Sequence, residues 1–117
     1  MSRDVARIFA DIDSMDPDKF VAHLTPDVTF RFANADPAQG RAATRDGVAA
    51  FFATISGMTH HILNTWEVGD TVIVQIDVEY VRQDGKTVVT PNADILVFDG
   101  DLVRDWQIYI DVAPVYA

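Results

Sequence analysis

The chain contains no cysteine among its 117 residues. This absence excludes disulfides, thiolate nucleophiles and metal sites built from cysteine. It is also typical of proteins in a reducing compartment, so we expect a cytoplasmic location.

Positive charge is scarce as well. Lysine and arginine together number 9 against 18 aspartates and glutamates, which gives a formal net charge of −9. A chain with this charge is repelled by phosphate backbones, so we expect no binding to nucleic acids.

Long apolar runs are missing. The longest, residues 48–53, is far shorter than the roughly 20 residues that span a bilayer. The first residues, Met1-Ser2-Arg3-Asp4, lack the positively charged and then apolar pattern of a secretory signal. We therefore expect neither a membrane span nor a signal peptide.

Alternation of apolar and polar residues dominates the second half of the chain. It extends over four runs, residues 60–68, 72–82, 87–98 and 101–111. A period of two predicts strands of a sheet with one packed and one wetter face. At this length we expect one domain, residues 1–117, without a separate cofactor domain.

The first half shows helical spacing instead. Ser2 and Thr44 are suitable N-caps for a first and a third helix, and Asp16-Pro17 predicts the start of a second. We expect helices over residues 3–15, 17–24 and 44–55, a strand over 28–32 and a loop over 33–43. The predicted fold class is α+β, a curved and mostly antiparallel sheet wrapped around three N-terminal helices as a cystatin-like cone.

Turn signals predict the pairing of the long strands. A two-residue turn at Asp99-Gly100 pairs Val97 with Leu102, and a four-residue connection after Arg82 pairs Tyr80 with Val89. This register places Asp94 on the outer face, although a slip of one residue or a bulge near Pro91 would turn it inward with Leu96 and Phe98. The residues predicted to face the helices are Val74, Ile76, Val78, Tyr80, Val89, Ala93, Ile95, Val97, Trp106, Ile108 and Ile110.

The order of these elements and several local strings resemble the nuclear transport factor 2-like superfamily, and its SnoaL-like members in particular. The strings are FADIDSMD at 9–16, PDVTF at 26–30, GR at 40–41, THHI at 59–62 and WQIYID at 106–111. The resemblance covers nearly the whole chain and implies the cone fold of ketosteroid isomerase, scytalone dehydratase and polyketide cyclases. This fold hosts many chemistries and many non-enzymes, so the resemblance implies a pocket but no particular reaction.

The resemblance to scytalone dehydratase is partial at the residue level. Its catalytic aspartate aligns with Asp13 and its first catalytic histidine with His61, whereas its two active-site tyrosines fall on Ile12 and Phe30. An active-site asparagine falls near Asp94. The match implies that Asp13 and a histidine are the candidates for moving a proton.

Limonene epoxide hydrolase matches less well. Its catalytic arginine falls on Gln75 and one of its two carboxylates falls on Ile108. Without the arginine and that carboxylate, its hydrolytic mechanism is not expected here.

His60 and His61 are neighbours in a predicted strand and therefore face opposite ways. Counting in twos from Trp66, which we expect on the packed face, turns His60 inward, whereas the resemblance indicates His61. A β-bulge near Thr65 would reverse the facing, and both histidines stay candidates. Two adjacent histidines on a flat strand cannot share a metal ion, and His23 lies on a helix elsewhere, so we expect no metal.

Aromatic residues of the packed face are candidates for holding a small apolar molecule. An ordinary role in the core is the alternative for each of them. The candidate ligand-contacting residues are Phe30, Phe32, Trp66, Tyr80, Asp94 and Trp106.

Three hypotheses of function follow. The first is an enzyme that uses neither metal nor organic cofactor and applies general acid-base chemistry to an apolar cyclic or polyketide-like molecule. The second is a non-catalytic module for binding a hydrophobic ligand or for dimerisation, and the third is a protein-protein adaptor. Because Leu96, Phe98, Val103 and Tyr109 are too apolar for a wetted outer face, we also expect a homodimer through that face.

Overall fold

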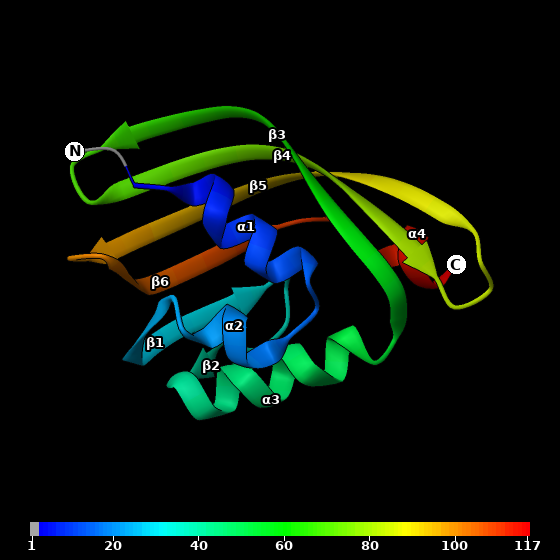
Figure 1. The fold of residues 1–117 in the computed structure, drawn as a ribbon, viewed down its shortest axis with the longest axis horizontal. Coiled ribbons are helices and arrows are strands. Elements are labelled where there is room, and N and C mark those ends of the chain that lie inside the picture. Colours follow the sequence, from blue (N-terminus) through cyan, green and yellow to red (C-terminus); the bar gives the residue numbers. More distant parts are fainter. Residues whose placement is uncertain (1–2) are drawn as a thin grey trace.

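The computed structural model describes residues 3–117 and has α+β architecture. Six strands form one sheet in the order β2-β1-β6-β5-β4-β3, in which only the β1–β6 pair is parallel. The sheet is strongly curved, does not close on itself, and covers α1, α2 and α3 (Figure 1). The predicted fold class is confirmed. The elements are α1 (Val5–Asp13), α2 (Pro17–Val21), β1 (Leu24–Phe32), β2 (Ala38–Gln39), α3 (Arg41–Phe52), β3 (Ile55–Val68), β4 (Thr71–Arg82), β5 (Thr87–Asp99), β6 (Leu102–Tyr109) and α4 (Ala113–Tyr116).

The helix starts agree only in part with the sequence signals. α2 begins after Asp16, whose carboxylate accepts a hydrogen bond from the Asp18 N–H (2.9 Å), as predicted. The cap of α1 is Asp4, and the expected cap, Ser2, lies outside the described residues. Within residues 3–117, no helix is long and apolar enough to cross a bilayer.

The third helix begins earlier than expected. Its N-cap is Gly40, with φ of +88°, and Thr44 lies inside the helix as a buried residue. The Thr44 hydroxyl donates to the Gly40 carbonyl (2.8 Å), so this buried hydroxyl has its hydrogen-bond partner within the first turn of the helix. The helix also ends earlier, at Phe52, because the chain enters β3 at Ile55.

The predicted pairing of β4 with β5 is wrong by one residue. Tyr80 lies opposite Val88 because the connecting loop has three residues, and the Arg82 N–H donates to the Lys86 carbonyl (2.8 Å). Gly85 supplies the positive φ (+86°) that such loops need at their last position.

The β5–β6 hairpin is displaced further, by two residues at its turn, because Leu102 lies opposite Asp99 instead of Val97. Asp99 pairs with Leu102 around a turn whose first residue, Gly100, has φ of +61°, and a bulge follows between Val97 and Phe98. The inner face of β5 therefore carries Thr90, Asn92, Asp94, Leu96 and Phe98, which are all buried. The residues Val89, Ala93, Ile95 and Val97, predicted to face inward, face outward instead.

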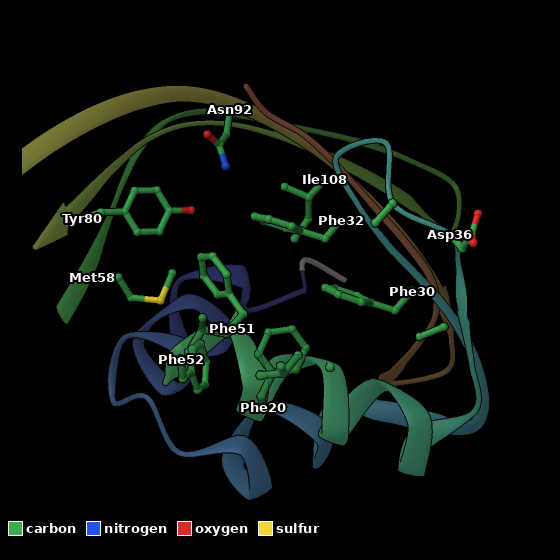
Figure 2. A pocket seen from close by; sticks show the side chains of 15 residues that line it. Phe20, Phe30, Phe32, Asp36, Phe51, Phe52, Met58, Tyr80, Asn92 and Ile108 are labelled. Atoms are coloured by element: carbon green, nitrogen blue, oxygen red, sulfur yellow. The ribbon is translucent and has the colours of Figure 1, made fainter. Parts of the chain in front are cut away.

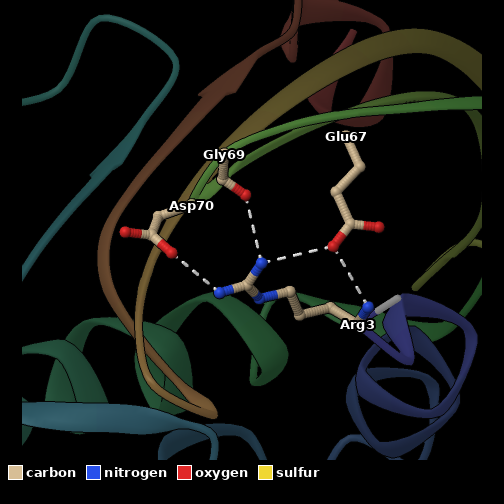
Figure 3. Close-up of polar contacts among 4 residues, drawn as sticks. All are labelled: Arg3, Glu67, Gly69 and Asp70. Carbon is tan, nitrogen blue, oxygen red and sulfur yellow. Dashed lines mark hydrogen bonds and ion pairs between the residues drawn. The ribbon is translucent and has the colours of Figure 1, made fainter. Parts of the chain in front are cut away.

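Arg3 ties the start of α1 to the β3–β4 turn (Figure 3). Its guanidinium donates to the carboxylates of Glu67 (3.3 Å) and Asp70 (3.0 Å) and to the Gly69 carbonyl (3.1 Å). It also lies 5.0 Å from the centre of the Phe98 ring. Fixing this end of α1 over the sheet directs the other end, and with it Asp13, toward the middle of β3.

Candidate functional site

A cavity of about 240 Å³ lies between α3, β1 and the inner face of the sheet (Figure 2). Its wall is mainly aromatic and aliphatic, as in pockets for small organic molecules. The lining residues are Ile12, Phe20, Phe30, Phe32, Ala35, Asp36, Ala38, Gly47, Val48, Phe51, Phe52, Met58, Tyr80, Asn92 and Ile108.

Small and exposed residues mark where the cavity opens. Ala35, Asp36 and Gly47 line it and are exposed to solvent, whereas the phenylalanines deeper in the wall are buried or half-buried. The opening therefore lies between the β1–β2 loop and the middle of α3.

Two polar side chains enter this apolar space. The Tyr80 hydroxyl and the Asn92 amide are directed into the cavity (Figure 2). Burial raises the pKa of Tyr80 well above its ordinary value, and the negative charges of Asp94 and Asp13 act in the same direction. Tyr80 is therefore a protonated hydrogen-bond donor at any physiological pH.

Asp13 and His60 form a hydrogen-bonded pair beside the cavity. Asp13, the last residue of α1, holds the His60 Nδ1 at 2.5 Å and accepts the His60 backbone N–H at 3.0 Å. The His60 ring packs on Phe9 with centroids 4.9 Å apart. Donation of Nδ1–H to the carboxylate leaves Nε2 with a free lone pair, which is the arrangement that a general base requires.

Asp94 is a buried carboxylate in the middle of β5. Its side chain is 1% exposed, and its Oδ2 accepts a hydrogen bond from the Trp106 indole N–H at 3.1 Å. Within residues 3–117, Oδ1 has no hydrogen-bond partner. Burial raises the pKa of Asp94 to about 6, against the opposing effects of the Trp106 hydrogen bond and the His60 charge.

These four side chains, Asp13, His60, Tyr80 and Asp94, form what we call the inner polar cluster. His60 acts electrostatically on Asp94, and both carboxylates act on Tyr80. Only Tyr80 is itself part of the cavity wall, where Ile12 and Met58 stand next to the Asp13–His60 pair. The cluster thus lies behind the wall and reaches the cavity through Tyr80.

His61 is on the wrong side of the sheet for the role that the resemblance assigned to it. Its side chain is 52% exposed on the outer face, and its Nε2 lies 3.4 Å from Glu79. A bulge is present, between Ile62 and Asn64, but Trp66 follows it on the outer face and is 50% exposed. The extra residue puts His60 and Trp66 on opposite faces, so the prediction of a packed Trp66 is wrong.

The other aromatic candidates lie inside the cone. Phe30, Phe32 and Tyr80 line the cavity. Trp106 is buried but lies behind the wall, stacked on Phe20 with centroids 5.2 Å apart. Contact of any of them with a ligand stays a prediction.

Sequence reasoning missed Asn92 because its register put this residue outside. A signal was present, since Asn92 and Asp94 share parity with Leu96 and Phe98, whose size favours burial. The same shift removes Leu96 and Phe98 from the predicted outer face, and the bulge in the β5–β6 pairing removes Val103, so all three are buried in the core. Across residues 3–117, no three histidine, aspartate or glutamate side chains gather as a metal site.

Comparison with known proteins supports this architecture. The structure is similar to a protein of ketosteroid isomerase-like fold from Catenulispora acidiphila in complex with trimethylamine (TM-score 0.87, 19% identity, 95% of this chain and 87% of that chain covered). A putative SnoaL-like polyketide cyclase from a Jannaschia species is also similar (TM-score 0.81, 19% identity, 95% and 85% covered). So is an epoxide hydrolase from M. tuberculosis that resembles limonene epoxide hydrolase (TM-score 0.79, 16% identity, 96% and 83% covered).

At this level of identity the likeness shows the shared fold. No curated protein matches the chain in sequence. The SnoaL-like domain model, in contrast, matches residues 5–106. This range contains every residue of the cavity wall except Ile108, and all four members of the inner polar cluster. The chain therefore belongs to the SnoaL-like domain family.

Proposed function

We propose that the protein is an acid-base enzyme, without metal or organic cofactor, that moves a proton within a small and largely apolar carbonyl compound, either cyclic or polyketide-like. The observation that carries the proposal is the Asp13–His60 pair, 2.5 Å between Oδ1 and Nδ1, behind the wall from which the Tyr80 hydroxyl enters the cavity. The coarser conclusion, an enzyme-like fold for small molecules, agrees with the cyclase and epoxide hydrolase among the structural neighbours.

The proposed reaction uses one donor and one base. The Tyr80 O–H donates to the carbonyl oxygen of the ligand, and the His60 Nε2 takes a proton from the adjacent carbon. The electrons of the broken C–H bond move into the enolate, whose oxygen keeps the hydrogen bond from Tyr80. Return of the proton from Nε2 to another carbon of the conjugated system completes an isomerisation. If the second carbon from the carbonyl carries a hydroxyl group, the enolate electrons form a C=C bond as the C–O bond breaks, the leaving oxygen takes the proton from Nε2, and water departs in a dehydration.

Asp13 is a positioning residue in this scheme. By accepting Nδ1–H it fixes the tautomer of His60, and its negative charge stabilises the imidazolium that forms. The backbone N–H of His60 holds the same carboxylate at 3.0 Å, which keeps its orientation. Access to Nε2 requires movement at the wall, and Met58, on the same face of β3 two residues before His60, is the flexible side chain best suited to it.

Hydrogen-deuterium exchange tests the proposal without knowledge of the substrate. Cyclic ketones, enones and 1,3-diketones are incubated in D2O with the protein, and exchange at the carbon next to the carbonyl is followed by proton NMR. We expect His60→Gln to abolish acceleration and Asp13→Asn to reduce it about 100-fold or more, while ligand binding persists.

His61→Gln is the matched control, because it removes the neighbouring histidine on the outer face. Equal rates in the His60 and His61 variants would refute the role of the pair. A change in the pH profile of the Asp13→Asn variant distinguishes positioning of His60 from a purely structural role.

A second candidate function is non-catalytic binding of a hydrophobic ligand. It is favoured by the wall itself, in which Asp13 and His60 have no part and the polar side chains are Asp36, Tyr80 and Asn92. Binding of the ketone panel without any accelerated exchange would support this function and exclude the first.

We also propose that two copies associate through the outer face of the sheet. Support comes from exposed apolar side chains there, with Trp66 at 50% and Tyr109 at 57% exposure, and from half-buried Ile73 and Ile95 beside Trp66. Trp66→Lys should convert a dimer to a monomer in sedimentation velocity, with Ala42→Lys, at an exposed position of α3 away from this face, as the control. A monomeric native protein at micromolar concentration would contradict the proposal.

A further inference from the structure

The cavity wall carries negative charge but no positive charge among the described residues. Of the lining residues within 3–117, none is a lysine, arginine or histidine, and Asp36 at the opening is the one ionisable carboxylate. The whole chain carries a net charge of −9, so a cation is attracted toward the opening and an anion is repelled.

The wall is also rich in aromatic rings. Five phenylalanines and Tyr80 line a space of about 240 Å³ (Figure 2), and the wall residues Phe32 of β1 and Phe51 of α3 lie with ring centroids 4.9 Å apart. The face of an aromatic ring carries negative partial charge, and a compact ammonium group within about 6 Å of it is attracted. A quaternary or tertiary ammonium group exposes apolar methyl or methylene surface as well, so it loses less on leaving water than a bare ammonium does.

A buried carboxylate without a cation lies directly behind this wall. Asp94 is 1% exposed, is in no ion pair with residues 3–117, and has one oxygen, Oδ1, without a partner. Asp94 lies opposite the wall residue Ile108 in the β5–β6 pairing, and the wall residue Asn92 precedes it by two positions on the same face of β5. His60, the basic side chain whose charge acts on Asp94, already has its Nδ1 engaged by Asp13.

Asn92 adds an acceptor to the same side. Its amide is satisfied when the nitrogen donates to Thr90 Oγ1 (3.1 Å) and to the Pro91 carbonyl (3.1 Å), with nitrogen and oxygen exchanged relative to Figure 2. The oxygen then faces the cavity. Aromatic faces, an amide oxygen and an uncompensated carboxylate all favour positive charge.

We propose that the cavity selects a hydrophobic ammonium ion, in which one compact tertiary or quaternary ammonium group lies among Phe32, Phe51 and Tyr80 on the side of Asp94. The inference rests on the proposed function only in using the same cavity, and it narrows the apolar ligand to one that carries a single positive charge. A neutral polycyclic molecule of equal size would fill the space but leave Asp94 without a counter-charge.

An isosteric pair of probes tests the selection. Phenyltrimethylammonium and tert-butylbenzene have the same shape and differ by a charged nitrogen in place of a carbon. Their dissociation constants are measured at pH 7.5 by following the amide signals of the cavity wall in NMR titrations. We expect the cation to bind at least roughly tenfold more tightly, and equal or weaker binding of the cation would overturn the proposal.

Two variants separate the sources of this preference. Asp94→Asn should reduce the preference to about threefold or less, whereas Asp99→Asn, the same charge change at an exposed site on the same strand, should leave it unchanged. Phe51→Leu removes one aromatic face and should weaken binding of the cationic probe more than binding of the neutral probe. This variant provides the test if Asp94→Asn does not fold. Equal effects of the Asp94 and Asp99 variants, with no selective effect of Phe51→Leu, would refute the site.

The outcome is independent of catalysis. His60→Gln leaves the wall and Asp94 in place, so the preference for the cation should persist in it even though exchange activity is lost. Selection without accelerated exchange would refute the proposed function alone, and accelerated exchange without selection would refute this inference alone.

Discussion

Replacement of Asp94 by asparagine isolates the cost of ionising a buried carboxylate. Burial raises the pKa of Asp94 from its ordinary value near 3.8 to about 6. The folded protein therefore holds this proton more tightly than the unfolded chain does. The contribution of this bound proton to the free energy of unfolding is complete below pH 3.8 and is lost as the pH rises through about 6.

The size of the effect follows from the same two values. At about 1.4 kcal/mol for every tenfold change in proton affinity, the difference between 3.8 and about 6 corresponds to roughly 3 kcal/mol. Asparagine has nearly the same shape and cannot ionise. The Asp94→Asn variant should therefore gain about 3 kcal/mol relative to the native protein from strongly acidic pH to pH 7.5, about four fifths of it above pH 4.

Urea unfolding of both proteins at pH 4, 5, 6 and 7.5 measures this gain. The difference between the two free energies of unfolding at each pH removes the contribution of the other titrating groups, and the change of this difference with pH removes any constant cost of the amide. A difference that increases with pH, centred between pH 4 and 6, confirms the buried carboxylate. Parallel curves for the two proteins would refute the reasoning, because they would mean that Asp94 ionises as freely when folded as when unfolded.

Three further substitutions test single local features of the fold. Gly47→Ala should stabilise the protein by roughly 0.5–1 kcal/mol in thermal unfolding, because Gly47 lies within α3 and an added Cβ meets nothing within 4 Å. Asp16→Ala should cost about 1 kcal/mol, because it removes the acceptor of the Asp18 N–H at the start of α2, and unchanged urea midpoints would contradict this. Trp106→Phe should cost about 1–3 kcal/mol and more at pH 8 than at pH 5, because it leaves ionised Asp94 without its hydrogen bond. An equal loss at both pH values would show that only packing was removed.

The fold could be predicted because its signals are local and redundant. Asp16-Pro17 marks the start of α2, and the alternating runs define the long strands whatever their exact partners. The residues Phe30, Phe32 and Tyr80 could be assigned to the inside because each lies in a strand with clear parity. Such assignments depend only on the alternation of apolar and polar residues, which can be read directly from the sequence.

The register could not be predicted from the same signals. A loop of three residues instead of four after Arg82 reverses the facing of every side chain on β5, including Asn92 and Asp94. The bulge after Ile62 does the same to Trp66 relative to His60. Both are single-residue choices that depend on how the strands pack, so only the three-dimensional structure decides them.

The pairing of Asp13 with His60 is a long-range fact of the same kind. The two residues are 47 positions apart, and which histidine Asp13 meets depends on how α1 lies over β3. The sequence supplied the aspartate and two adjacent histidines. The position of α1, which Arg3 fixes at the other end, determines that Asp13 contacts His60 and not His61.

A crystal structure with a phenol bound in the cavity tests the central claim most directly, because a phenol imitates the planar, oxygen-bearing enolate of the proposed reaction. We predict the phenol oxygen within hydrogen-bond reach of the Tyr80 hydroxyl, about 2.6–3.2 Å, and a ring carbon beside it in contact with the His60 Nε2. A phenol that occupies the cavity while the wall residues Ile12 and Met58 still separate it from His60 would contradict acid-base catalysis by this pair.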